Sequence, residues 1–421
     1  MRRSIVLAGA GLLLATAWHG PAAQAPGTAV YAAVGAELRQ YDLDATPGTL
    51  TRRGAVTLPA NVQEAALHPS GRYLHVGWSS AGASYGELGG APGQAPRHGV
   101  TAFRIDAASG ALTPHGAPIP LRARPIHLTT DGDGRHLLAA YNLPSGVSVH
   151  RLERDGTIGA EVEQPRALDA GIYAHHVRVL PSNRGVVLVT RGNAPTAASP
   201  EDPGALKVFA YADGALTNRA SIAPNGGYDF QARHLDFHPT RPWAYLTLER
   251  QNRIAVFDVA GESLSAAPRF VKTTLAEPGN VRPGQTTSSI HVHPNGRVVY
   301  VGNRASATVA FEGARVSAGG ENTIAVFAID RTTGEPTLIQ TADTRGFQPR
   351  AFALDPGGRV LVVGNQTALA VRDGQRVRTV PASLSTFTIG PDGRLTFVRT
   401  YEVAAEPEAG RLLFWIGIAA H

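Results

Sequence analysis

The chain has 421 residues with a formal net charge of +6, 17% charged residues and no cysteine. The lack of cysteine excludes disulfides, thiolate metal sites and a cysteine nucleophile, and the basic residues are spread along the chain instead of forming the dense stripe that a nucleic-acid-binding face needs. With 47 glycines and 30 prolines, the composition favours many short strands joined by tight turns, so we expect an all-β protein with no nucleic-acid partner.

Residues 1–25 have the pattern of an export signal. Arg2 and Arg3 precede an apolar stretch over residues 5–17, and small residues ending at Ala25 form a cleavage site. The apolar stretch is too short to span a bilayer, and no second candidate span follows it. We therefore expect an exported protein, periplasmic or secreted, with no membrane span; the arginine pair leaves the twin-arginine route open.

A short turn flanked by apolar strand residues recurs through the rest of the chain. Its copies are spaced 49 to 63 residues apart, which is the repeat length of a propeller blade. They are HPSGR at His68, DGDGR at Asp131, LPSNR at Leu180, HPTRP at His238, HPNGR at His293 and DPGGR at Asp355. Apolar residues alternate before each turn and resume after it, so each turn joins the first two strands of a blade.

A third strand recurs more often than the turn, and a glycine followed by leucine or isoleucine then starts a fourth strand. The seven copies of the third strand begin at Glu37, Gly99, Gly146, Ala205, Arg253, Thr323 and Leu384. Seven third strands predict a seven-bladed β-propeller, which residues 26–421 would form as a single domain.

The mismatch between six turns and seven third strands predicts how the ring closes. The chain after the signal starts at a second strand, YAAVG from Tyr31, and a short apolar run from Leu412 has strand composition. Pairing of this C-terminal strand with the N-terminal one would complete the last blade and remove two exposed sheet edges. We expect the closed ring to be a monomer.

Two columns of positions stand out when the blades are aligned. One lies at the start of the first strand and the other just past the end of the second strand, so both fall on one face. The first column reads Gln63, Ile126, His175, Arg233, Ser288 and Arg350. The second column reads Ser79, Asn142, Arg191, Glu249, Arg304 and Gln366. All but Ile126 are polar, although the strands that carry them are apolar.

Long insertions fall on the same face, because they connect second strands to third strands. They cover residues 80–98, 192–204, 305–321 and 367–383. Loops lengthened on one side of a rigid scaffold are typical of the walls of a binding pocket.

The columns predict a site for a small anionic lactone or sugar acid. Arg233 and Arg304 would hold an anionic group and stabilise a developing oxyanion, while His175 or Glu249 would take a proton from water. Four further polar side chains would line the pocket: Arg350, Asn142, Gln366 and Arg191. This chemistry requires no cofactor, and no HxH or HExxH motif occupies a slot that faces the channel, so we expect no metal site.

Other prominent residues have structural interpretations. We assign His68, His238 and His293 to the turns that they open. His127, His176 and His234, beside the first column, are interpreted as packing residues, and Glu249 could simply form an ion pair with a neighbouring arginine.

Four segments together resemble the lactonase family of seven-bladed propellers, which includes propeller-type 6-phosphogluconolactonases and fungal carboxymuconate lactonizing enzymes. They are HHVRVLP from His175, ARHLDFHPTRPWAYLTLE from Ala232, IHVHPNGRVVYVGNR from Ile290 and QPRAFALDPGGRVLVVGNQ from Gln348. The resemblance covers the chain after the signal and implies active-site roles for residues at the positions of His175, Arg233, Glu249 and Arg304. The chain departs from the family pattern at residues 231–232 and 190–192.

The resemblance implies an exported lactonase that opens a sugar-type lactone. Because a phosphorylated sugar lactone is a cytoplasmic metabolite, the export signal points to another lactone or to loss of the activity. Two alternatives stay open: a non-catalytic envelope propeller that binds a protein or polymer, and an isomerase that closes a muconate-type acid.

Overall fold

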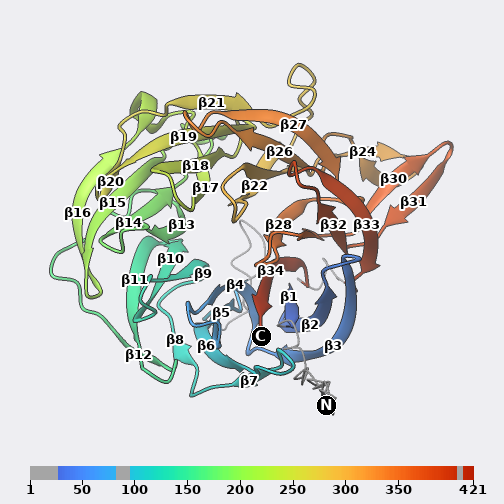
Figure 1. Ribbon diagram of the computed structural model, residues 1–421. Helices are drawn as coiled ribbons and strands as arrows, with labels where there is room; N and C mark the ends of the chain where they lie inside the picture. The colour runs from blue at the N-terminus through green and yellow to red at the C-terminus, as the bar shows by residue number, and fades with distance from the viewer. Residues whose placement is uncertain (1–26, 82–94, 405–410) are drawn as a thin grey trace, which may run out of the picture.

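The structure is a computed structural model that describes residues 27–81, 95–404 and 411–421, so the predicted export signal lies outside the described residues. Seven antiparallel sheets are arranged as blades around a central axis, and two short hairpins lie outside them (Figure 1). The predicted all-β, seven-bladed propeller is confirmed. None of the helices in the described ranges is long and apolar enough to cross a membrane.

The four strands of a blade run outward from the axis, and their positions match the predicted repeat. The innermost strands are β34 (Leu413–Ala420), β4 (Asn61–Leu67), β9 (Pro125–Thr130), β13 (Ala174–Val179), β17 (Ala232–Phe237), β22 (Gln285–Val292) and β28 (Pro349–Leu354). The second strands are β1 (Thr28–Val34), β5 (Tyr73–Ser79), β10 (His136–Asn142), β14 (Gly185–Thr190), β18 (Trp243–Leu248), β23 (Val298–Ala305) and β29 (Val360–Asn365).

The outer half of each blade is more variable. The third strands are β2 (Glu37–Asp44), β6 (His98–Ile105), β11 (Ser145–Leu152), β15 (Ala205–Ala212), β19 (Arg253–Ala260), β26 (Thr323–Ile329) and β32 (Ser383–Ile389). The outermost strands are β3 (Thr49–Thr57), β7 (Leu112–Pro114) with β8 (Ile119–Pro120), β12 (Ile158–Glu161), β16 (Ala215–Ile222), β20 (Ser263–Leu264) with β21 (Phe270–Thr273), β27 (Pro336–Asp343) and β33 (Leu395–Glu402). One 3₁₀ turn, η1, covers Pro224–Gly227.

The ring closes as predicted, by pairing of the two ends of the chain. β34 lies antiparallel to β1, in a register that runs from Thr28 opposite Ala420 to Val34 opposite Leu413. Figure 1 shows the C-terminus at this blade, between β4 and β1. The C-terminal strand therefore supplies the innermost strand of the blade that the N-terminal strands begin.

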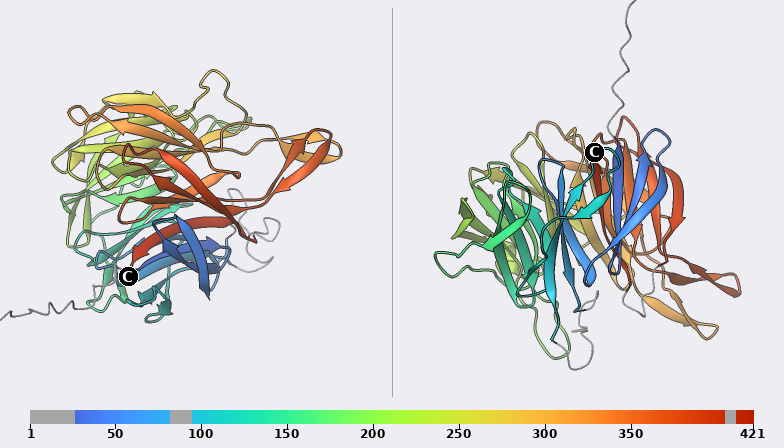
Figure 2. Two further views of the ribbon diagram at one scale, coloured as in Figure 1. Left: turned by 45° about the vertical axis from the view of Figure 1, so that its right-hand side comes forward. Right: turned by 90° about the horizontal axis from the view of Figure 1, so that it is seen from below.

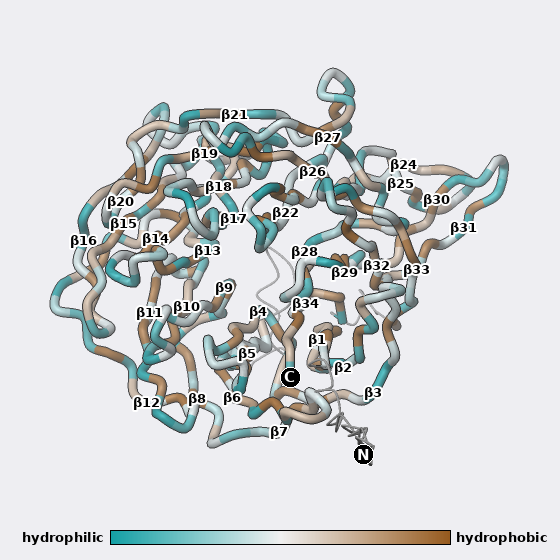
Figure 3. Tube along the Cα trace, viewed as in Figure 1, coloured by the Kyte–Doolittle hydropathy of each residue, from teal (hydrophilic) through white to brown (hydrophobic). Residues whose placement is uncertain are grey.

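The hydrophobic core lies between neighbouring blades. Second and third strands are buried on both faces, so they read as nearly continuous apolar runs, and every residue of β10 and β18 is buried. In one interface Val187 and Leu206 pack with Leu235 and Leu246 of the next blade. Figure 3 shows the hydrophobic colour along these strands and hydrophilic colour on β17 and β22, next to the axis.

The turn histidines link adjacent blades. Nε2 of His68 lies 2.9 Å from the carbonyl oxygen of Gly134, the glycine in the turn of the next blade. His238 and His293 make the same contact with Gly296 at 2.9 Å and with Gly358 at 2.8 Å. A Cβ added at Gly134, where φ is +67°, would lie 2.3 Å from the His68 ring, so only glycine fits. The structural interpretation of these histidines agrees with their contacts.

The two faces of the ring differ. On the turn face lie the short turns that join first and second strands; on the loop face lie the longer connections from second to third strands. Two of these connections form hairpins, β24 (Thr308–Phe311) with β25 (Ala314–Ser317) and β30 (Leu369–Asp373) with β31 (Arg376–Val380). Figure 2 shows both hairpins projecting beyond the blades on the same side.

Candidate functional site

A β-bulge in the innermost strands places the first-column side chains. In β13, Ala174 lies opposite Thr190 and His176 lies opposite Val189, so His175 is an extra residue without a partner of its own. Registers shift at the equivalent places in β4 and β28, at Gln63 and Arg350. A bulge redirects side chains that strict alternation would send to opposite faces. Two successive residues, such as His175 and His176, can therefore both face the axis.

A repeated backbone contact places the second column beside the first. Two residues before the first-column position, Tyr173, Gln231 and Gln348 have φ values of +59°, +35° and +54°. Their carbonyl oxygens accept the backbone N–H of Arg191, Glu249 and Gln366 at 2.9, 2.9 and 3.1 Å. A left-handed backbone conformation is strained at residues other than glycine, and such residues are found most often at functional sites. The predicted adjacency of the two columns is therefore present in at least three blades.

Glu249 is the centre of an arginine cluster on the loop face. Its Oε2 lies 2.9 Å from Nη1 of Arg191, and its Oε1 lies 3.2 Å from Nε of Arg233 and 2.6 Å from Nη2 of Arg304. Glu249 is only 4% exposed and Arg233 only 1%. Burial alone would raise the pKa of Glu249, but Arg304, Arg233 and Arg191 lower this pKa to about 2. Glu249 is therefore ionised, and it binds a proton weakly.

His175 lies beside this cluster as a neutral imidazole. Its side chain is 1% exposed, and its Nδ1 has no hydrogen-bond partner among the described residues. Burial is the main reason that the pKa of His175 is well below its usual value, and the positive charges of Arg233 and Arg350 lower it further. A buried neutral imidazole with an unengaged nitrogen can exchange a proton with a bound molecule.

Arg350, in β28, packs against the closing blade. Its guanidinium carbon is 4.0 Å from the ring centroid of Phe414, the second residue of β34, and that of Arg124 is 5.8 Å from the same ring. Arg124 also donates from Nε to Oε1 of Gln63 at 2.6 Å. The column comparison missed Arg124 because it precedes Ile126, the one apolar residue of the first column. The sequence signal that could have identified Arg124 is its place in the repeat. Arg124 stands two residues before the first-column position of its blade, as Tyr173 and Gln348 do in theirs.

Asn142 and Gln366 are buried, like His175 and Glu249. Asn142 is 3% exposed, and its Nδ2 donates to the Tyr173 hydroxyl at 2.7 Å. The Tyr173 ring in turn lies 4.5 Å from the Arg191 guanidinium carbon. Gln366 is 7% exposed, and its backbone bonds Gln348 and Leu413. Tyr173, which no column contains, therefore connects two of the predicted site residues.

A layer of histidines lies next to His175 along the axis. The rings of His127 and His176 are 3.8 Å apart, those of His176 and His234 are 4.5 Å apart, and those of His175 and His234 are 5.2 Å apart. Burial lowers the pKa of His127 to about 3 and those of His176 and His234 well below the usual value. These histidines are neutral and packed against one another, in keeping with their interpretation as packing residues.

The loop-face cluster carries excess positive charge. Arg191, Arg233 and Arg304 surround a single ionised carboxylate, that of Glu249, and a fourth arginine, Arg350, acts on the neighbouring His175. Such an arrangement favours an anionic or oxyanionic ligand, which arginine can bind through paired hydrogen bonds. Within the described ranges, no group of three or more histidine or acidic side chains could hold a metal ion.

Comparisons with known proteins agree with this geometry. A family model described as lactonase, 7-bladed beta-propeller, matches residues 27–379. A 6-phosphogluconolactonase of Bacillus subtilis is 28% identical over 307 residues, which are 68% of this chain and 78% of the relative. A 6-phosphogluconolactonase of Pectobacterium carotovorum is also 28% identical, over 76% of this chain and 82% of the relative.

Solved structures share the fold. The periplasmic gluconolactonase of Pseudomonas aeruginosa superposes with a TM-score of 0.65 at 21% identity, covering 93% of this chain and 99% of that protein. A putative 6-phosphogluconolactonase of Bacteroides fragilis superposes with a TM-score of 0.66 at 17% identity, covering 95% of this chain and 100% of that protein.

Proposed function

Because the chain belongs to the lactonase family of seven-bladed β-propellers, we propose that it is a hydrolase that opens a sugar-type lactone. The observation that supports this most directly is the arrangement on the loop face, where a buried neutral histidine adjoins arginines organised by one carboxylate. Curated relatives that match most of the chain are named 6-phosphogluconolactonase, which is a lactone hydrolase.

In this proposal Arg233 and Arg304 bind the lactone carbonyl and its anionic substituent. Water attacks the carbonyl carbon, and the negative charge that develops on the carbonyl oxygen is stabilised by the guanidinium groups. Arginine suits this task because it stays charged even when it is buried. Arg350, Arg191, Asn142 and Gln366 complete the binding site, directly or by holding their neighbours in place.

His175 is the better of the two candidate bases. Glu249 would have to leave one or more of three ion pairs to bind a proton, and its pKa of about 2 makes it a weak base. His175 is neutral and has an unengaged Nδ1 within the described structure. We therefore assign proton transfer from water to His175, and the positioning of the arginines to Glu249.

The predicted export signal favours a substrate that is found outside the cytoplasm. An exported enzyme does not meet a cytoplasmic sugar phosphate, so we propose a lactone of a plain or carboxylated sugar acid outside the cytoplasm. The signal pattern in residues 1–25 supports this compartment. The fold is compatible with it, since a periplasmic protein has the same architecture.

The test is the hydrolysis of a panel of lactones by purified protein without residues 1–25. Acid release from gluconolactone, its 6-phosphate and a uronic acid lactone is followed in weak buffer and compared with spontaneous ring opening. We expect acceleration by the wild type and at least a 100-fold smaller kcat for His175→Gln, since general bases contribute about 10² to 10⁴ in rate.

His115→Gln is the matched control, because the His115 ring also lies close to another ring, that of Tyr73, but is on the outer surface. It should retain wild-type rates. A wild type that opens no lactone faster than buffer would contradict the proposal, and binding without turnover, detected as a raised melting temperature, would favour a binding propeller.

A further inference from the structure

A third column of polar residues stands two positions before the first column. Its residues are Asn61, Arg124, Tyr173, Gln231, Thr286 and Gln348. The proposed reaction assigns a task to none of them. Two members, Tyr173 and Thr286, contact the arginine of their own blade with their side chains. These arginines, Arg191 and Arg304, bind Glu249 from the blades on either side of it.

Thr286 holds Arg304 at the guanidinium group. It lies opposite Arg304 in the pairing of β22 with β23, and its Oγ1 accepts the Nε–H of Arg304 at 3.2 Å. The next residue, Thr287, donates its backbone N–H to the backbone carbonyl of Glu249 at 2.9 Å. The strand segment that carries Thr286 is therefore fixed to the residue that supplies the carboxylate as well as to the arginine.

The guanidinium of Arg304 is held at two points. Its Nε donates to Thr286, and its Nη2 donates to Oε1 of Glu249 at 2.6 Å. Nη1 carries further N–H groups, and the Arg304 side chain is 16% exposed. Because the guanidinium is planar and rigid, two fixed nitrogens set the direction of the third. Thr286 therefore decides where Arg304 points the N–H groups that can bind a ligand.

Tyr173 holds Arg191 on the other side of Glu249. Its ring lies 4.5 Å from the guanidinium carbon of Arg191, and its backbone carbonyl accepts the Arg191 N–H at 2.9 Å. The Tyr173 hydroxyl accepts a hydrogen bond from Asn142 at 2.7 Å, so the ring itself is held in place. Arg191 binds Oε2 of Glu249 at 2.9 Å. Each carboxylate oxygen of Glu249 thus bonds an arginine that a third-column side chain orients.

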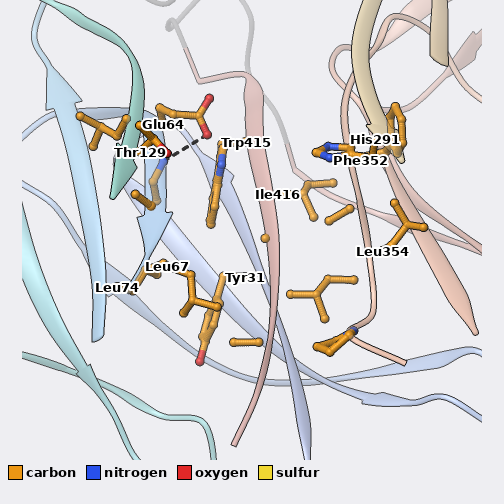
Figure 4. A pocket seen from close by; sticks show the side chains of 18 of the residues that line it. Tyr31, Glu64, Leu67, Leu74, Thr129, His291, Phe352, Leu354, Trp415 and Ile416 are labelled. Carbon is orange, nitrogen blue, oxygen red and sulfur yellow. Dashed lines mark hydrogen bonds between the residues drawn. The ribbon is translucent and has the colours of Figure 1, made fainter. Parts of the chain in front are cut away.

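A cavity on the turn face does not reach this arrangement. Its volume is about 390 Å³, and its lining includes Tyr31, Glu64 and His291. Figure 4 shows Glu64 beside Trp415 in this cavity. None of the described residues that line it belongs to any of the three columns. A ligand that contacts Arg304 therefore binds on the loop face, where the third column stands.

We propose that Thr286 and Tyr173 are positioning residues that direct Arg304 and Arg191 toward the substrate. This inference rests on the proposed function and deepens it. Negative charge develops on the lactone carbonyl oxygen as water adds, and donors stabilise this charge best when they already point at its position. Without the Thr286 hydroxyl, Glu249 still binds Arg304, but the guanidinium rotates about that single contact. The expected effect is a loss of rate with the fold intact.

The experiment compares the wild type with Thr286→Val, which keeps the branched shape of the side chain and replaces the hydroxyl with a methyl group. On a lactone that the wild type opens, we expect kcat to fall about tenfold with little change in KM, because a misdirected catalytic group slows the reaction. Thr286→Ser, which keeps the hydroxyl, should recover most of the rate. Urea unfolding should not distinguish Thr286→Val from the wild type, because valine suits a strand.

Ser221→Ala is the control. Ser221 Oγ also accepts a hydrogen bond from a basic side chain, that of Lys207, at 2.9 Å, but it lies in the outermost strand β16. This variant should keep the wild-type kcat and KM. At Arg191, Tyr173→Leu removes the ring and should lower kcat, whereas Tyr173→Phe keeps the ring and should lower kcat less.

Two outcomes would overturn the inference while leaving the proposed function intact: Thr286→Val with wild-type kcat, or a reduced kcat that Thr286→Ser does not recover. Should Thr286→Val not fold, wild-type rates in both Tyr173 variants would overturn it. If the wild type opens no lactone, the proposed function fails, and calorimetric binding of gluconate tests the inference separately. Thr286→Val should then bind gluconate about tenfold more weakly, since a carboxylate takes the place of the carbonyl. Equal affinities, or no binding by the wild type, would refute the inference.

Discussion

Nη2 of Arg304 lies 2.6 Å from Oε1 of Glu249, although 55 residues separate them in the chain. Glu249 follows β18, and Arg304 is the penultimate residue of β23 in the next blade. The same carboxylate binds Arg191, which follows β14 in the preceding blade. One buried side chain thus joins three blades at the loop face, so the site depends on the ring as a whole.

Glu249→Gln should lower both the stability of the protein and its catalytic activity. Removing the charge leaves Arg191, Arg233 and Arg304 close together without their shared anion, and breaking a buried ion pair costs about 3 kcal/mol. Urea unfolding should show this loss, and kcat/KM should fall at least 100-fold. Glu262→Gln is the control, because Glu262 also binds two arginines, at 3.2 and 2.8 Å, but is 26% exposed. Glu262→Gln should lower the free energy of unfolding by less than about 1 kcal/mol. Equal losses of unfolding free energy in the two variants would contradict the prediction.

The fold and the closeness of the two columns could be predicted because the repeat relates each blade to the next. His175, Arg233, Glu249 and Arg304 stand out since they interrupt apolar strands at equivalent positions, and Glu249 does contact both arginines. The repeat could not predict the side-chain directions that the β-bulge changes. Strict alternation sends successive residues such as Gln63 and Glu64 to different faces of the strand, whereas the bulged register lets both face the axis. The column comparison missed Tyr173 and Arg124, because their contacts are made between blades.

Arg350→Gln should weaken the binding of anionic lactones selectively. The loss of one charge-assisted hydrogen bond costs about 1.5 to 3 kcal/mol, which corresponds to at least a tenfold rise in KM. A neutral lactone should show a smaller rise, and kcat should change less than KM. Arg345→Gln is the matched control: Arg345 lies 5.3 Å from the Phe397 ring, as Arg350 lies over Phe414, but it is on the outer surface. Equal effects on charged and neutral lactones would contradict an anion-binding role.

Activity should not decline on mild acidification. A solvated histidine base loses activity as the pH falls through about 6.5, whereas burial and nearby arginines hold the pKa of His175 well below that value. Because the base stays neutral, kcat/KM should be nearly constant from about pH 7.5 to 5.5. Initial rates across this range, corrected for spontaneous hydrolysis, provide the measurement. A descending acidic limb centred near pH 6.5 would show that His175 is solvated or is not the base.

Removal of residues 412–421 should open the ring. The truncation deletes β34, and the backbone of β1 then loses its partner along the whole of Thr28–Val34. An unpaired strand at a sheet edge associates with other chains, and Val30 and Ala32 lose their packing against Ile416. Light scattering after size exclusion should show aggregates, compared with the chain that lacks only residues 1–25. A soluble, monomeric truncated protein would contradict closure by strand exchange.

Glu64→Gln should change how stability depends on pH. The pKa of Glu64 is about 8 in the folded protein against an ordinary value of 4.5 for the unfolded chain, so the folded form holds its proton over a range where the unfolded form has released it. The contribution of this group is fully present below pH 4.5 and is lost as the pH rises through about 8. Because glutamine does not titrate, the melting temperature of the variant should rise relative to the wild type across that interval. A constant difference would indicate that Glu64 is ionised in the folded protein.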